Sequence, residues 1–238
     1  MSTIAPHHLV LDTGSPTVSL AVGRPGGPAA TRTLELRRSS EELLGSVNEA
    51  LGELGLQVSD LGGVTALAGP GSFTGLRVGL ATALGLHQAM GVPARAVPTL
   101  PILARAAAGA LADGEQVVAV VDALRGEWMA QTFSLEGGEP QAVDAPGLRT
   151  VEALAATGRP LVGFGLGAFH SVGVDAARCF QAPPLAPLAL HADLDAPWDP
   201  GSLVEPIYFR PPATTPSKVL AGLPSKRLAG LPGKKLAR

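Results

Sequence analysis

The sequence predicts an α/β protein built from two similar halves. In each half an apolar run ends in an aspartate, and a turn and a second apolar run follow. Leu9–Asp12 leads into Thr17–Gly23, and Val117–Asp122 leads into Glu127–Leu135. Leucine and valine at helical spacing occupy much of the sequence between these units. We therefore predict a tandem duplication with its join near residues 111–115, with chance recurrence of apolar strands ending in aspartate as the alternative.

The first half continues as alternating strands and helices. Apolar residues at 3.6-residue spacing predict the helices, and short apolar or alternating runs bounded by Gly and Pro predict the strands. The elements expected after the first two strands are, in order, a strand over 29–36, a helix over 39–54, a strand over 62–69, a helix over 74–90, a strand over 92–98 and a helix over 100–111.

The second half gives weaker signals after its two strands. We expect a helix over 150–157, a strand running into a glycine turn over 161–169 and a proline-started helix over 183–194. The predicted organisation is therefore a first domain over 1–111, a smaller second domain over 112–210 and a basic segment over 211–238.

Composition limits the classes of protein to which the chain can belong. Apolar residues make up 46% of the 238 residues, so the chain can bury a core, and only 4% are aromatic. Cys179 is the only cysteine, which excludes an intrachain disulfide and a cysteine-based zinc site. The N-terminus lacks the pattern of a signal peptide, and no apolar run is long enough to cross a membrane. We therefore expect a soluble, cytoplasmic protein.

Charge is distributed unevenly along the chain. Residues 1–210 hold 12 Lys and Arg against 20 Asp and Glu, a net charge of −8, whereas residues 211–238 hold six basic residues and no acid. This basic segment repeats itself, as LAGLPSKR from Leu220 and LAGLPGKK from Leu228. Frequent Gly and Pro disfavour a helix or a core, so we expect disorder, with weak and salt-dependent contact to RNA phosphates as the alternative.

A glycine-rich segment precedes the second long helix. Its spacing fits neither a nucleotide P-loop, nor a dinucleotide fingerprint, nor the glycine pattern of a hydrolase nucleophile elbow. We therefore expect a turn that delivers a capped helix N-terminus, with anion binding by free N–H groups as the alternative. The residues of this glycine loop are Gly69, Gly71, Ser72, Thr74, Gly75 and Arg77.

Two carboxylates are the best acidic candidates for chemistry. Asp12 and Asp122 end equivalent strands, where a carboxylate facing a cleft could hold magnesium beside a nucleotide. The alternative is that each side chain accepts hydrogen bonds from its own turn. No two of the five histidines have the spacing of a helical metal site, and His87 is expected at an interface or satisfied within its helix.

The helix over 74–90 has few polar side chains and two ridges of small residues. Gly75, Gly79 and Ala83 form one ridge, and Ala81, Gly85 and Ala89 form the other. A helix that is apolar nearly all round must be covered nearly all round. We therefore expect one face to meet the sheet and another to meet a second helix or a second protein.

Four segments together resemble the bacterial TsaB (YeaZ) family over about residues 8–210. They read GPGSFTGLRVG (69–79), LVLDTGSPTVSLAV (9–22), VDALRGEWMAQTF (121–133) and EPIYFR (205–210). The resemblance implies two tandem ribonuclease H-like domains of the actin/Hsp70/sugar-kinase type, with mixed sheets flanked by helices. It also implies a non-catalytic accessory subunit in the synthesis of threonylcarbamoyladenosine on tRNAs that read ANN codons. The catalytic relative, TsaD, carries a histidine-containing metal motif where this chain reads VPTLPILA (97–104).

The resemblance also implies partners and an interface. The helices over 39–54 and 74–90 would form a bundle with a TsaD-type transferase, or with a second copy of this chain when it is alone. A TsaE-type ATPase would complete the complex, and tRNA would be contacted indirectly or weakly through the basic segment. No cofactor of its own is expected, since ATP and metal would be used by the partners. The alternative is a free-standing ATP-dependent enzyme or peptidase of the same fold. The expected interface residues are Leu43, Leu44, Val47, Leu51, Leu76, Leu80, Leu84 and His87.

Overall fold

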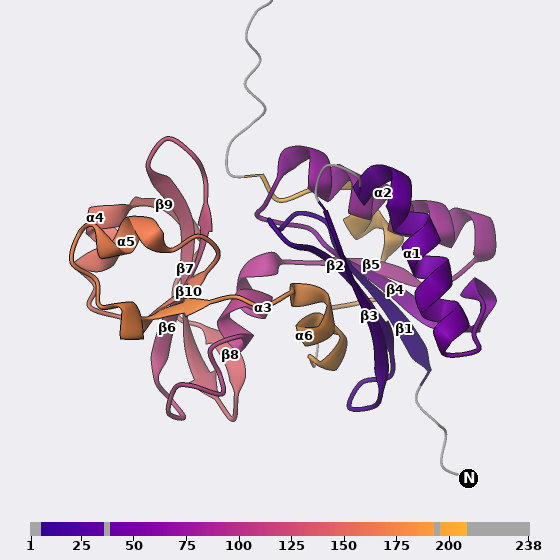
Figure 1. Cartoon of the computed structure of the whole chain (residues 1–238), viewed down its shortest axis with the longest axis horizontal. Helices are drawn as coiled ribbons and strands as arrows, with labels where there is room; N and C mark the ends of the chain where they lie inside the picture. Colours follow the sequence, from indigo (N-terminus) through magenta and orange to yellow (C-terminus); the bar gives the residue numbers. More distant parts are fainter. Residues whose placement is uncertain (1–5, 36–38, 193–195, 209–238) are drawn as a thin grey trace, which may run out of the picture.

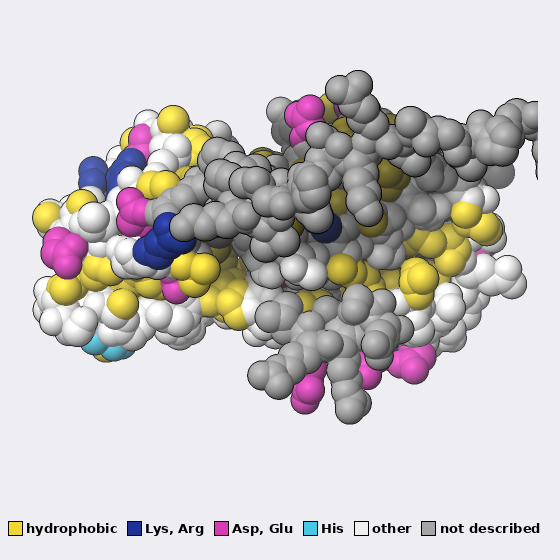
Figure 2. All heavy atoms as spheres, turned by 90° about the horizontal axis from the view of Figure 1, so that it is seen from above, with side chains coloured by type: hydrophobic (Ala, Val, Ile, Leu, Met, Phe, Trp, Pro, Cys, Tyr) yellow, Lys and Arg dark blue, Asp and Glu magenta, His cyan; other side chains and the backbone are white. Residues whose placement is uncertain are grey.

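Two mixed β-sheets form two lobes, seen side by side in perpendicular views (Figure 1, Figure 2). The computed structural model describes residues 6–35, 39–192 and 196–208. The predicted basic segment, 211–238, lies outside the described residues. The mixed α/β architecture with helices against both sheets confirms the predicted fold class.

The first sheet has the strand order β3-β2-β1-β4-β5. Strand β1 is antiparallel to β2 and parallel to β4, and helices α1 and α2 cover one face of the sheet (Figure 1). The elements of this lobe are β1 (His7–Asp12), β2 (Val18–Gly23), β3 (Ala29–Leu34), α1 (Ser39–Glu53), η1 (Val58–Asp60), β4 (Leu61–Leu67), α2 (Phe73–Met90) and β5 (Ala94–Val97).

The second sheet repeats this arrangement. Its order is β8-β7-β6-β10-β11, with β6 antiparallel to β7 and parallel to β10, and β9 pairs with β7 beyond this path. The predicted duplication is therefore confirmed at the level of strand order and direction. The elements are β6 (Gln116–Asp122), β7 (Glu127–Glu136), β8 (Glu139–Ala142), β9 (Gly147–Thr150), α4 (Val151–Ala155), β10 (Leu161–Gly163), α5 (Gly167–His170), η2 (Ala176–Arg178) and β11 (Cys179–Gln181).

One short helix from each half packs against the sheet of the other half. Helix α3 (Thr99–Arg105) follows β5 but packs against β6, β7 and β8, and Arg105 pairs with Glu139 there. Helix α6 (Leu185–His191) follows β11 but packs against β1 and β2, where the N–H of Ala186 donates to the buried Ser19 Oγ (3.2 Å). One apolar cluster consequently extends through both lobes.

The end of the described chain also lies on the first lobe. The 3₁₀ helix η3 (Pro200–Val204) contacts β5 and α2, and Ser202 Oγ accepts a hydrogen bond from the N–H of Ala96 (2.8 Å). The packing therefore crosses the predicted boundary between the two domains, because α6 and η3, which fall in the predicted 112–210 domain, pack against the first sheet. The sequence-based domain boundaries themselves stay a prediction.

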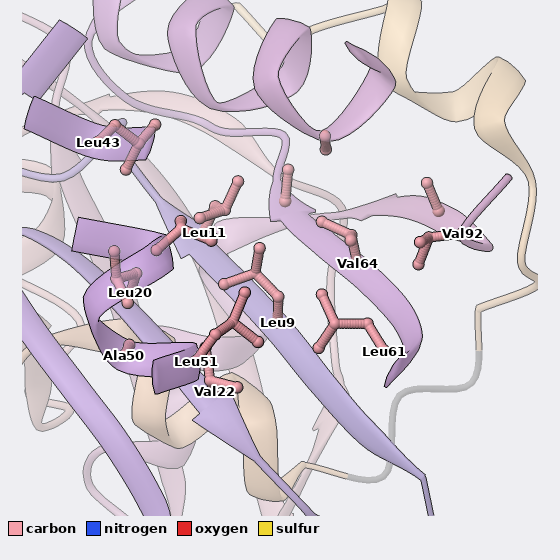
Figure 3. Close-up of a cluster of buried hydrophobic side chains, with 14 of the residues drawn as sticks. Leu9, Leu11, Leu20, Val22, Leu43, Ala50, Leu51, Leu61, Val64 and Val92 are labelled. Atoms are coloured by element: carbon pink, nitrogen blue, oxygen red, sulfur yellow. The ribbon is translucent and has the colours of Figure 1, made fainter. Parts of the chain in front are cut away.

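The core between α1 and the first sheet is built from aliphatic side chains. Leu43 and Leu51 point from α1 toward Leu9 and Leu20 of the sheet (Figure 3). All four are fully buried. Burying a leucine side chain contributes roughly 2 kcal/mol, so this layer holds α1 to the sheet without any aromatic residue.

The β6–β7 turn holds two non-glycine residues in the left-handed region. Leu124 and Arg125 have φ of 64° and 59°, and the N–H of Leu124 donates to Asp122 Oδ1 (2.7 Å). Leu124 is also 70% exposed, so its side chain gains little from packing. This conformation costs an ordinary residue roughly 1–2 kcal/mol, whereas asparagine tolerates it.

We therefore expect Leu124→Asn to raise the free energy of unfolding by about 1 kcal/mol. Urea unfolding followed by circular dichroism measures the change. The control is Leu148→Asn on strand β9, where the backbone is extended and no gain is expected. Equal effects of the two substitutions would contradict the strain argument.

Candidate functional site

The glycine loop connects the end of β4 to the start of α2. Ser72 is the N-cap of α2, and its side chain accepts a hydrogen bond from the N–H of Gly75 (3.3 Å). The N–H of Ser72 in turn donates to the carbonyl of Gly14 in the β1–β2 turn (2.8 Å). Ser72 therefore provides the predicted cap of the helix, and Thr74 is exposed.

The loop glycines allow α2 to lie directly on the β1–β2 turn. A Cβ at Gly75 would collide with the carbonyl oxygen of Thr13, one at Gly79 with the Thr13 hydroxyl, and one at Gly71 with the backbone of Gly14. Thr13 Oγ1 donates to the carbonyl of Gly75 across this contact (2.7 Å). Close packing is therefore what these positions do in the structure. The first turn of α2 is therefore packed against the chain's own β1–β2 turn.

Asp12 lies beneath this contact and is fully buried. Its Oδ1 accepts hydrogen bonds from the N–H groups of Gly14 and Ser15 (3.2 Å each), whereas Oδ2 has no hydrogen-bond partner among the described residues. Burial raises the pKa of Asp12 to about 6, opposed by the hydrogen bonds from Ser15 and Gly14. Ionising a carboxyl group in such a place is costly.

Asp122 occupies the equivalent place in the second sheet but not an equivalent environment. It is exposed, and its Oδ1 accepts from the N–H of Leu124 within its own turn. The two carboxylates end corresponding strands of the two sheets, so the duplication repeats the position but not the burial. Within the described ranges no group of three His, Cys, Asp or Glu side chains is placed to hold a metal ion.

Arg77, one turn into α2, joins an aromatic cluster. Its guanidinium lies 4.0 Å from the ring centroid of Phe73, and its Nε donates to the Tyr208 hydroxyl (2.9 Å). The two rings lie 4.8 Å apart, centroid to centroid. The segment that carries Tyr208 is held in place by a backbone hydrogen bond, in which the N–H of Ile207 donates to the carbonyl of Ala68 (2.7 Å). We call these three side chains the Phe73–Arg77–Tyr208 cluster.

The structure places most of the residues predicted for the interface on α1 and α2 inside the chain's own fold. Five of the eight predicted residues are buried within the chain's own fold, and two others, Leu84 and His87, are half-buried. His87 Nδ1 lies 2.9 Å from the carbonyl oxygen of Val92, so its ring is satisfied locally. Helical periodicity identifies the apolar stripe of each helix but not what covers it. In this chain the first sheet covers much of that stripe. The five buried residues are Leu43, Val47, Leu51, Leu76 and Leu80.

A different face of the two helices points outward, and we call it the outer face. Leu44 and Met90 are 55% and 52% exposed. The rest is small, and a Cβ added at any of its three glycines would meet nothing within 4 Å. Where described atoms of this lobe are visible from above, hydrophobic side chains lie at the surface together with some acidic ones (Figure 2). The outer face consists of Leu44, Gly45 and Gly52 of α1 and Ala81, Gly85, Ala89 and Met90 of α2.

A pocket of about 370 Å³ lies on the opposite face of the first sheet, beside the end of α6. Arg95 is almost fully buried in its wall, with its guanidinium 4.2 Å from the ring centroid of Trp198, and Trp198 meets His8 edge-on. Burial, and after it the nearby charge of Arg95, lower the pKa of His8 and thus favour its neutral form. His191 Nδ1 accepts from the N–H of Gly26 (3.1 Å).

This pocket corresponds to none of the features predicted from the sequence. Its residues come from distant parts of the chain and share no local spacing that could have indicated it.

None of the helices in the described ranges combines the length and the apolarity needed to cross a membrane.

Comparisons with known proteins agree with the geometry. The family model described as tRNA N6-adenosine threonylcarbamoyltransferase, TsaD, matches residues 33–161. An uncharacterized protein of Mycobacterium tuberculosis is 30% identical over 216 residues, which cover 89% of this chain and 95% of that protein. The YeaZ structure from Pseudomonas aeruginosa superposes with a TM-score of 0.66 at 26% identity, over 78% of this chain and 90% of that one.

Relatives named TsaB match about half of the chain. The tRNA threonylcarbamoyladenosine biosynthesis protein TsaB of Haemophilus influenzae is 34% identical over 119 residues, or 50% of each chain. TsaB of Escherichia coli is 32% identical over 119 residues, which cover 50% of this chain and 51% of that protein. The family model matches more than half of this chain, and the YeaZ structure superposes on 78% of it. The chain therefore belongs to the TsaB (YeaZ) family.

Proposed function

We propose that this chain is a non-catalytic subunit that binds a TsaD-type transferase through α1 and α2. In this role it supports threonylcarbamoylation of the adenosine next to the anticodon in tRNAs that read ANN codons. The names of its relatives supply the pathway, and the outer face of α1 and α2 is the single observation that carries the binding role.

The chemistry of the outer face suits a helix–helix contact. Glycine and alanine let two helix axes approach closely, and the separation between packed helices depends on the side chains at the contact. Leu44 and Met90 add apolar area at the two ends of the face. The glycine and alanine positions of this face carry no polar side chain, so another helix pair can cover them with little loss on desolvation. The exposed residues Glu42, Asn48, Glu49, Glu53 and Gln88 lie on the same two helices and would have to stay solvated or find polar partners.

The glycine loop and Asp12 support a subunit without its own phosphate chemistry. The first turn of α2 is engaged with the β1–β2 turn, and Asp12 lies fully buried beneath it. Residues 97–104, VPTLPILA, contain no histidine. In this proposal ATP and metal are used by the TsaD-type transferase and a TsaE-type ATPase, and a homodimer forms through the same face when the chain is alone.

Ala81→Arg is expected to abolish co-elution with a TsaD-type transferase. Ala81 is exposed at the middle of the outer face, so an arginine there would enter a desolvated contact without room or a counter-charge. The matched control is Ala153→Arg, because Ala153 is an exposed alanine on a helix of the other lobe. Both variants should retain the thermal transition of the unsubstituted chain, and only Ala81→Arg should lose the complex and the modification of tRNA in a reconstituted reaction.

Undiminished co-elution of Ala81→Arg would place the partner elsewhere. Robust ATP turnover or proteolysis by the purified chain alone would instead favour the free-standing enzyme. That activity should then be lost in Asp12→Ala.

A further inference from the structure

Arg77 continues the outer face toward the start of α2. It lies four residues before Ala81, which lies four residues before Gly85, so the three positions share one side of the helix, and all three are exposed. Phe73, which is 42% exposed, extends the same row by one more turn. A second helix that packs along the outer face would therefore meet Arg77 at its end.

The charges on the two helices single out Arg77. Neither α1 nor α2 contains another Lys or Arg. The helix α2 has no acidic residue, whereas Glu42, Glu49 and Glu53 are exposed on α1. A partner that covers these helices therefore meets one cationic side chain on them, so Arg77 is the position on α1 and α2 that attracts a carboxylate of the partner.

The guanidinium of Arg77 is held in one orientation. Its Cζ lies over the Phe73 ring, 4.0 Å from the centroid, and its Nε donates to the Tyr208 hydroxyl (2.9 Å). Arg77 makes no other hydrogen bond within the described residues, so its two terminal nitrogens keep their four N–H groups for a partner. A guanidinium fixed in this way presents a planar fork that fits the two oxygens of a carboxylate.

Tyr208 is itself fixed by the segment 196–208, which packs against the first lobe. At the start of this segment Nη1 of Arg95 donates to the carbonyl of Ala196 (2.6 Å), and near its end Ile207 makes the backbone hydrogen bond described above. Because its backbone is held at both ends, the segment keeps the Tyr208 hydroxyl beside α2. The end of the described chain thus orients a side chain of the helix that carries the outer face.

We propose that Arg77 anchors the transferase contact by pairing with a carboxylate of the TsaD-type transferase, and that Tyr208 is its positioning residue. This inference rests on the proposed function, which supplies the partner. Arginine is enriched among the interface residues that carry most of the binding energy, and a side chain ordered before binding loses less entropy on binding. When the transferase covers α2 the pair is desolvated, so removal of Arg77 leaves a buried carboxylate without its partner.

Surface plasmon resonance of the full chain with the purified transferase measures the association and dissociation rates. Arg77→Gln should weaken binding on the order of 100-fold, mainly through faster dissociation, as expected for a buried pair that loses one partner. Arg77→Lys keeps the charge but not the fork, and should weaken binding about tenfold. The matched control Arg125→Gln, at an exposed turn of the other lobe, should bind normally.

A double-mutant cycle tests the role of Tyr208. Tyr208→Phe keeps the ring and removes the hydroxyl, and should weaken binding about fivefold. In a chain that already carries Arg77→Gln it should change nothing further, because Tyr208 acts through Arg77. Equal weakening in both backgrounds, with a lower thermal transition, would make Tyr208 merely structural and overturn its positioning role.

Charge reversal identifies the partner group. Arg77→Glu should abolish the complex, and exchange of one Asp or Glu of the transferase for Arg should restore it. The proposal is overturned if no such exchange restores binding, or if Arg77→Gln binds the transferase normally. It is also overturned if Arg77→Gln loses only affinity for an unmodified tRNA transcript, which would make Arg77 a phosphate contact.

The same measurements separate this inference from the proposed function. Normal binding by Arg77→Gln together with loss of the complex by Ala81→Arg would overturn the inference and leave the proposed function standing. Normal binding by both variants would contradict the proposed function itself.

Discussion

Gly75→Ala is expected to lower the free energy of unfolding by roughly 3 kcal/mol. Its Cβ would meet the carbonyl oxygen of Thr13, which is backbone and cannot rotate away. Helix α2 would have to lift from the β1–β2 turn, and the hydrogen bonds from Thr13 Oγ1 to Gly75 and from Ser72 to Gly14 would lengthen or break. Overpacking costs about 1–3 kcal/mol, and each hydrogen bond contributes about 1 kcal/mol.

Gly85→Ala, in the same helix, provides the control. An added Cβ there meets nothing within 4 Å, so only intrinsic helix propensity acts, and it favours alanine by about 1 kcal/mol. Urea unfolding of both variants should therefore show shifts of opposite sign. Equal destabilisation by the two substitutions would show that helix α2 does not depend on its contact with the turn.

Between pH 4 and pH 8, Asp12→Asn is expected to gain roughly 3 kcal/mol in the free energy of unfolding relative to the unsubstituted chain. Burial raises the pKa of Asp12 from 3.8 to about 6, and a shift of about two units corresponds to about 3 kcal/mol. Asparagine keeps the oxygen that accepts from Gly14 and Ser15 and removes the charge. If Asp12 instead held magnesium for a nucleotide, the unsubstituted chain would be stabilised by Mg-ATP and the variant would not.

The pH dependence of this gain follows from the direction of the pKa shift. Above pH 6 the carboxyl is ionised in both the folded and the unfolded chain, so the penalty for burying the charge is fully present. As the pH falls from 6 toward 3.8, the folded chain takes up the proton first, and stability from this group rises. The advantage of Asp12→Asn should therefore be greatest at pH 7–8 and nearly absent at pH 4. A gain that does not change with pH would contradict the buried charge as its cause.

Much of the fold could be predicted because its signals are local. Apolar runs that end in Asp12 and Asp122 mark corresponding strands, and the spacing of apolar residues marks α1 and α2. The reciprocal cover by α3 and α6 could not be predicted. Both helices are short and apolar, and nothing in their own sequence tells which of two similar sheets each one meets.

Of the candidate site, likewise, only the features with a local sequence signal could be predicted. The role of the glycine loop follows from spacing, since Gly75 and Gly79 lie one turn apart on one side of α2, and the structure places both against Thr13. Helical spacing could not tell which covering the apolar stripe meets, and Leu43 and Leu80, predicted for the interface, are buried within the chain's own fold. The second ridge, Ala81, Gly85 and Ala89, already carried the signal for the outer face. The pocket around Arg95 and Trp198 has no counterpart in local sequence.

The reciprocal placement of α3 and α6 has a consequence for synthesis on the ribosome. The first sheet emerges early, but α6 and η3, which complete its core, lie beyond residue 184. The apolar face of the first sheet, which includes Val10 and Ala21, therefore stays uncovered by α6 until most of the polypeptide has been translated. The first lobe consequently cannot complete its core before the second lobe is synthesised. A ribosome stalled before α6 would leave this apolar surface exposed, and chaperones would bind it.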